Sequence, residues 1–137
     1  MIHMIYDIIE NCLKKLLIDY PIRYQQLGEQ EVQVIGIFLN DIAVHKRVNG
    51  DVEYIETLLT VQFHEKDDIH KGYRICELIN KLNNTIYVYN NTHTILGFNS
   101  QEGSVYKGLT DKGLHLFSQD FIIQYRIKRK EDETYGQ

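Results

Sequence analysis

The sequence has 137 residues, 43% apolar and 25% charged, a balance typical of one soluble globular domain. No apolar run approaches the roughly 20 residues that span a bilayer, so we expect no membrane-spanning helix. The formal net charge of −4 disfavours a surface that binds duplex nucleic acid, because such affinity depends mainly on neutralising phosphates.

The first segment, Ile2 to Ile18, repeats apolar residues at the three- and four-residue spacing of an amphipathic helix. Lys14 and Lys15 fall late in this segment, where they suit the helix dipole. Pro21 is the single proline and disfavours continuation, so the helix is predicted to end near Asp19. Acidic residues inside the segment argue against a secretory signal, and we expect a protein made in the cytoplasm.

The next stretch predicts an exposed connector followed by sheet. The connector is Ile22 to Gln30, which is rich in glutamine. Val32 to Asn40 is apolar and β-branched without clean alternation, as in a strand that is covered on both faces or lies at an interface. Asn49-Gly50, between the apolar runs of Ile42 to Glu65, predicts a β-hairpin, because this dipeptide suits the tight turn that joins two antiparallel strands.

A second helix is predicted from Ile69 to Leu82, with Asp68 as its N-cap. Asn83 and Asn84 can close it, because asparagine tolerates the left-handed backbone of a helix end. Two extended pieces follow, over Thr85 to Asn90 and Thr94 to Phe98.

The last third predicts a long loop and then a long strand. Asn99 to Gly113 is rich in glycine and charge and shows no periodicity, so we expect a functional or mobile loop. Leu114 to Lys130 alternates apolar and polar residues, which indicates a strand of up to roughly 50 Å. We expect part of it to project beyond the domain and offer an exposed edge to partner chains. Residues 1–130 are predicted to form one domain, and 131–137 a polar tail.

Catalytic and metal motifs are not expected in this sequence. His64-Glu65 begins a zinc-protease pattern, but Asp68 stands where the second histidine is needed. The two cysteines, Cys12 and Cys76, fall on predicted apolar helix faces, which indicates buried thiols rather than a disulfide or zinc site. We therefore predict no catalytic residue, no metal and no cofactor.

The order of elements predicts an α+β fold, a mainly antiparallel sheet with an N-terminal and a central helix on one face and a long C-terminal strand. This layout resembles the tail-terminator and head–tail joining proteins of long-tailed phages, often called minor capsid proteins. The resemblance spans nearly the whole chain. It is carried above all by Ile95-Leu96-Gly97 and by the aromatic-polar strand Phe117 to Arg126.

The resemblance implies a structural protein of the virion tail or neck that closes the tail tube as a homo-oligomeric ring, with six copies expected. Its implied partners are further copies of itself, the tail tube protein and a head connector or neck protein, while DNA only passes through. A modestly acidic protein suits that conduit, because like charge limits adhesion of DNA. The candidate interface residues are Lys46, Arg47, Tyr106, Lys107, Arg126, Lys128, Arg129 and Lys130.

Alternatives from other classes remain open at this point. The chain could be another neck or head-completion protein, or a small module that adds a peptide strand at an open sheet edge. It could also be a small metal-dependent enzyme, with a site around His64, Asp67, Asp68 and His70.

Overall fold

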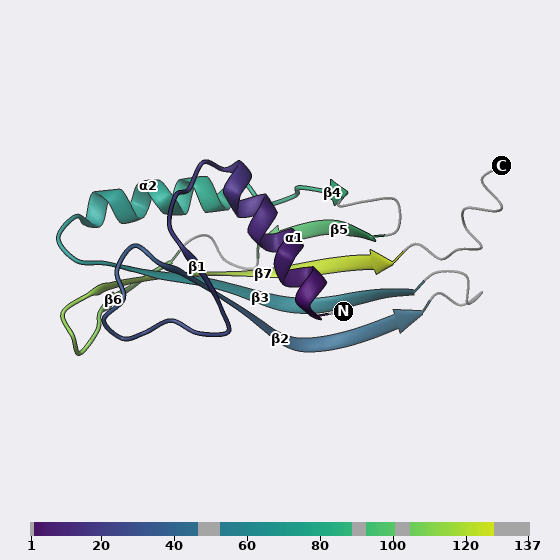
Figure 1. Cartoon of the computed structure of the whole chain (residues 1–137), viewed down its shortest axis with the longest axis horizontal. Helices are drawn as coiled ribbons and strands as arrows, with labels where there is room; N and C mark the ends of the chain where they lie inside the picture. Colours follow the sequence, from purple (N-terminus) through teal and green to yellow (C-terminus); the bar gives the residue numbers. More distant parts are fainter. Residues whose placement is uncertain (1, 47–52, 89–92, 101–104, 128–137) are drawn as a thin grey trace.

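The computed structural model describes residues 2–46, 53–88, 93–100 and 105–127. Two layers are seen in Figure 1, a long twisted sheet and, on one side of it, the two helices of the described residues. This arrangement confirms the predicted α+β class and its mainly antiparallel sheet. The elements are α1 (Ile2–Lys15), β1 (Ile22–Tyr24), β2 (Ile35–Lys46), β3 (Glu53–Glu65), α2 (Ile69–Asn80), β4 (Tyr87–Val88), β5 (His93–Ser100), β6 (Val105–Leu109) and β7 (His115–Ile127).

Of the seven strands in the described residues, six run in the order β1-β2-β3-β7-β5-β4, and the seventh, β6, pairs with β7 beside this path. All pairings are antiparallel except that of β1 with β2. The sheet opposes Lys46 to Glu53, so β2 and β3 form the expected hairpin arms, while Asn49-Gly50 lies outside the described residues. β2 is one strand from Ile35, although the sequence indicated two separate apolar runs.

Strand β7 is central, which corrects the expectation of an exposed, protruding edge. β3 pairs along one side of β7 from His115 to Arg126. On the other side, β6 pairs with residues up to Ser118 and β5 pairs from Phe121 onward. The backbone of this long alternating segment is therefore hydrogen-bonded to strands on both sides. Its length is explained by pairing with three neighbouring strands rather than by a projecting arm.

Three other boundaries differ from the sequence predictions. α1 ends at Lys15 rather than near Asp19, and Leu17 adopts a positive φ of 64° after its end. The expected connector contains β1, a short parallel strand against β2. The expected long loop contains β6, which has no apolar alternation and is ordered by pairing with β7. Residues 128–137, with the predicted tail, lie outside the described residues.

The core lies between the helices and the inward residues of β2, β3 and β7. Phe63 and Phe117 are opposed in the β3–β7 register and stack with ring centroids 5.0 Å apart. Phe98 meets Phe121 edge to face at 6.0 Å. Both cysteines of the sequence, Cys12 and Cys76, are buried, as predicted. In the described part of the chain, neither helix is long and apolar enough for a membrane span.

Gly72 on α2 allows this helix to lie directly on Phe117. A Cβ at position 72 would stand 2.3 Å from two ring carbons of Phe117. Gly72→Ala is therefore expected to lower the free energy of unfolding by about 1–3 kcal/mol through overpacking, which outweighs a helix-propensity gain of at most ~1 kcal/mol. Urea denaturation measures the effect.

Gly97→Ala is the matched control, because a Cβ at this position in β5 would meet nothing closer than the Thr85 carbonyl at 3.9 Å. Equal stability of the two variants would contradict the close packing of α2 on β7.

Burial raises the pKa of the Cys12 thiol on α1 to about 12. Above about pH 9 the unfolded chain loses this proton while the folded chain keeps it, so stability is expected to fall as pH rises toward 12. Burial also raises the pKa of Tyr125, to about 12. Cys12→Ala should therefore make the fall shallower without removing it, as measured by urea unfolding between pH 7 and 10.5. Parallel stability profiles for variant and wild type would refute this account.

Candidate functional site: a groove on the open sheet face

The side of the sheet turned away from the helices, here called the open face, mixes polar and apolar residues. Alternate residues of β3 and β7 face this side in opposed pairs, among them Gln62 with Ser118 and Leu58 with Ile122. Thr60 Oγ1 donates a hydrogen bond to Asp120 at 2.7 Å across the same two strands. Such cross-strand pairs hold the register of a sheet whose open side has no packing layer among the described residues.

A groove of about 630 Å³ lies on this face. Its floor is formed by three adjacent strands and its walls by the β1–β2 loop and the β6–β7 turn. The floor residues are Phe38, Gln62, His64 and Leu116, and the wall residues are Gln26, Leu27, Glu29, Thr110, Asp111 and Lys112. A smaller hollow of about 420 Å³ lies along the same face and includes Glu56, Ile86 and Ile122.

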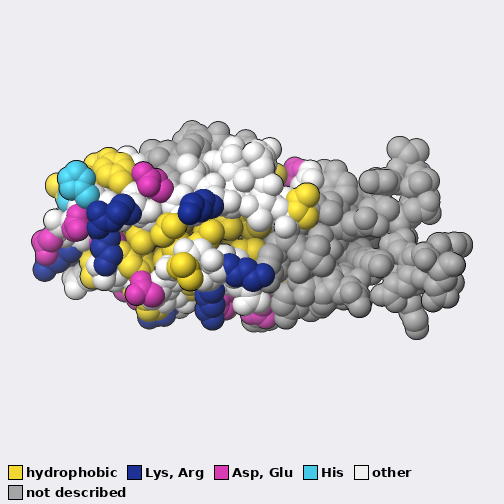
Figure 2. Space-filling model, turned by 90° about the horizontal axis from the view of Figure 1, so that it is seen from above, with side chains coloured by type: hydrophobic (Ala, Val, Ile, Leu, Met, Phe, Trp, Pro, Cys, Tyr) yellow, Lys and Arg dark blue, Asp and Glu magenta, His cyan; other side chains and the backbone are white. Residues whose placement is uncertain are grey.

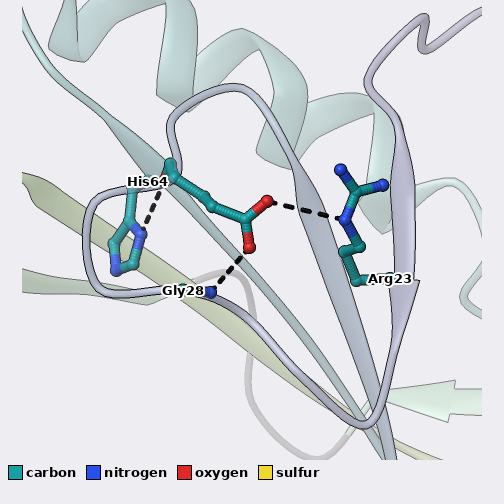
Figure 3. A network of polar contacts seen from close by, with 4 residues as sticks. Arg23, Gly28 and His64 are labelled. Atoms are coloured by element: carbon teal, nitrogen blue, oxygen red, sulfur yellow. Dashed lines mark hydrogen bonds and ion pairs between the residues drawn. The ribbon is translucent and has the colours of Figure 1, made fainter.

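The loop wall is fixed by Glu31, which joins three segments (Figure 3). One carboxylate oxygen of Glu31 accepts a hydrogen bond from the Gly28 amide at 2.8 Å, and the other lies 3.5 Å from Arg23 Nε. The Glu31 carbonyl oxygen lies 2.9 Å from His64 Nδ1. The Gln33 amide also donates to the His64 carbonyl at 3.0 Å. The loop is therefore held by a hydrogen bond within itself and by contacts with β1 and β3.

Gly36 lets the same loop pack against β2. A Cβ at this position would stand 2.8 Å from the Gln26 carbonyl oxygen and 3.0 Å from Phe38. Gln25 adds two hydrogen bonds between the loop and β2. Its backbone amide donates to the Ile37 carbonyl, and its side-chain oxygen accepts from the Leu39 backbone amide. The missing side chain in β2 thus allows the loop wall to pack closely on this strand.

The turn wall is ordered by Thr110. Its hydroxyl oxygen accepts from the backbone amides of Lys112 and Leu114, each at 3.3 Å. The Thr110 amide donates to the Leu114 carbonyl, and the Gly113 amide donates to Thr110. Gly113 adopts a positive φ of 76°, which glycine accommodates without strain. Both walls are therefore formed before any ligand binds.

Two tyrosine–carboxylate contacts lie behind this region, and one of them joins β1 to α1. Tyr20 Oη donates to Glu65, and both side chains are buried. Tyr24 Oη donates to Glu10 on α1. Burial, assisted by the neighbouring carboxylate, raises the pKa of both tyrosines. These hydroxyls remain protonated donors at neutral pH, which favours a structural role for the carboxylates they meet.

The predicted interface residues are dispersed. Tyr106 is half-buried, with its hydroxyl 2.6 Å from His115 Nδ1 and its ring against Phe117, whereas Lys107 is exposed. Lys46 and Arg126 lie near the ends of β2 and β7 away from the groove. The remaining candidates lie outside the described residues: Arg47, Lys128, Arg129 and Lys130.

Asp68, one of the residues considered for a metal site, has a structural role. Asp68 caps α2, accepting from the Lys71 amide at 3.0 Å, and its carboxylate lies 3.8 Å from Arg74. Within the described residues no group of three or more metal-ligating side chains converges. The sequence prediction missed the groove, because the groove residues come from five separate segments of the chain. Gly36, a glycine inside a β-branched run, was one available signal.

The helix side of the molecule is shown in Figure 2. Hydrophobic side chains gather along the middle of this view, with Lys and Arg side chains around them. Leu17 and Tyr73 are 90% and 46% exposed, respectively. This side therefore combines the charged outer surface of amphipathic helices with some uncovered apolar area.

Comparison with known proteins finds a similar fold among solved structures. No protein-family model matches the chain, and no curated protein matches it. Among solved structures, one described as the virion of a native gene transfer agent particle contains a chain of similar fold, with a TM-score of 0.51 and 10% identity. The match covers 85% of this chain and 84% of that chain. At this identity the likeness shows a shared fold.

Glu31→Ala removes the acceptor of the Gly28 amide and the partner of Arg23, while the backbone contact with His64 remains. Hydrogen–deuterium exchange is expected to be faster at Gly28. The free energy of unfolding should change by at most about 1 kcal/mol, since the ion pair is partly exposed to solvent. Glu29→Ala is the matched control, because this neighbouring glutamate lies on the groove wall and is exposed. Unchanged exchange at Gly28 would show that Glu31 does not hold the loop.

Proposed function

We propose that this chain is a structural virion protein that closes a tail tube as a ring and joins the tail to the head. The observation that carries the proposal is the fold shared, over most of both chains, with a chain of a gene transfer agent virion. The likeness of the sequence to phage tail-terminator proteins supports the same assignment. The role is non-catalytic, and the protein acts through the surfaces it presents.

The physical requirement for such a ring is a contact between two different surfaces. A heterologous contact repeated about a rotation axis closes into a ring, whereas a self-complementary contact stops at a dimer. The molecule is elongated (Figure 1), with the groove at the β6–β7 end and the tips of β2 and β7 at the other. Two unlike ends of this kind suit a head-to-tail arrangement of copies.

The proposed partners are further copies, six in a closed ring, together with the tail tube protein and a head connector. DNA passes through without being held, which fits the formal net charge of −4. The candidate interface residues are retained as contacts of the ring or of the tube. Lys107 is the clearest test residue among them, because it is exposed on β6.

Electron microscopy of the purified full chain, alone and mixed with tail tubes of the same particle, tests the proposal. Rings of uniform size and tubes capped at one end are expected. Lys107→Glu should reduce both, because it reverses an exposed charge at the contact surface. Lys81→Glu, on an exposed lysine that follows α2, is the matched control and should leave them unchanged. If neither rings nor capped tubes form with the wild-type chain, the assignment is wrong.

A further inference from the structure

The groove on the open face has the properties of a preformed binding site. Its loop wall is held by Glu31 and Gln25, and its turn wall by Thr110. Preformed walls lower the ordering cost of binding, so a ligand of modest size can bind specifically. A volume of about 630 Å³ falls within the range of small-ligand and peptide sites.

The lining of the groove defines the chemistry of its ligand. Phe38 and Leu116 supply an apolar floor. The side-chain amides of Gln26 and Gln62 are donors and acceptors that match the peptide bond. The exposed charges on the rim are Glu29, Asp111 and Lys112, while the His64 ring lies in the floor with its Nδ1 against the Glu31 carbonyl. A segment that carries both cations and anions together with an aromatic side chain complements these rim charges and the apolar floor.

The chain carries such a segment directly after β7. Residues 128–137 read KRKEDETYGQ, with three cations, then three acids, then Tyr135. The cations complement Glu29 and Asp111, and the acids complement Lys112. Tyr135 supplies an aromatic side chain of the kind that anchors interfaces.

The dimensions of β7 decide which copy this segment can reach. Leu116, in the groove, and Ile127, at the end of β7, are eleven residues apart along one strand, which is roughly 36 Å. Lys128, Arg129 and Lys130 directly follow Ile127 and span at most about 10 Å when fully extended. They therefore cannot reach Asp111 of their own chain, in the turn before β7, or Glu29, whose loop contacts His64 opposite Leu116. A second copy is therefore the partner whose groove rim these cations can meet.

We propose that the groove binds residues 128–137 of a second copy. Lys128, Arg129 and Lys130 of one copy lie against Glu29 and Asp111 of the next, with Tyr135 over the apolar floor. The contact joins opposite ends of two molecules and is heterologous, so its repetition leads to a ring. This inference rests on the proposed function and deepens it by naming the contact between copies.

Binding of a synthetic peptide tests the contact directly. A fluorescently labelled peptide of residues 126–137 is titrated with the full chain, and its anisotropy is recorded at low and high salt. Saturable binding that weakens with salt is expected. The double variant Glu29→Lys/Asp111→Lys should weaken binding by about tenfold or more, because two rim attractions become repulsions. Asp7→Lys/Glu77→Lys, on exposed positions of the two helices, is the matched control and should bind as the wild type does.

A charge-swapped peptide separates recognition from damage to the fold. With Lys128→Glu, Arg129→Glu and Lys130→Glu, the peptide should bind the wild-type chain weakly and the Glu29→Lys/Asp111→Lys variant more strongly.

Absence of saturable binding of the native peptide up to about 1 mM, or equal binding of native and swapped peptides, overturns the inference. Rings and capped tubes without peptide binding would reject this contact and leave the virion role standing. Peptide binding without rings or caps would support the contact and reject that role.

Discussion

The hydrogen bonding of β7 on both sides is the constraint on which the rest of the structure depends. β3 pairs with one side of β7, and β6 and β5 share the other. This central position fixes which residues of β7 face the helices, because a shift of one residue would turn every side chain to the opposite face. Phe117 and Phe121 are thereby placed in the core, and Leu116 in the floor of the groove.

Two glycines allow close packing on opposite faces of the sheet. Gly72 lets α2 approach Phe117 on the helix side, where close packing stabilises the fold. Gly36 lets the β1–β2 loop approach the open face, where it forms a wall of the groove. The absence of a side chain thus has two effects. It stabilises the fold on the helix side and allows a groove wall to form on the open face.

The edge of the sheet at β2 is poorly suited to the addition of another strand. Beyond the short β1, the outer edge of β2 is interrupted by a register shift after Asn40 and ends at Lys46. Bulges and lysines at an edge discourage another strand from pairing there. The groove instead has apolar, amide and charged groups in fixed positions. A ring built on it depends on side-chain recognition between copies rather than on a continuous sheet.

The sequence by itself determined the fold class, the capped helix begun by Asp68, the hairpin arms and the alternating core face of β7, because each of these follows from local periodicity or turn chemistry. The tertiary structure alone decided that β7 is central, that β6 forms within an apparent loop, and that β1 pairs in parallel with β2. Strands without a strong pattern of their own are ordered by their neighbours. The groove was also decided by the tertiary structure, since residues as distant as Gln26 and Lys112 become neighbours only when the sheet register brings their segments together.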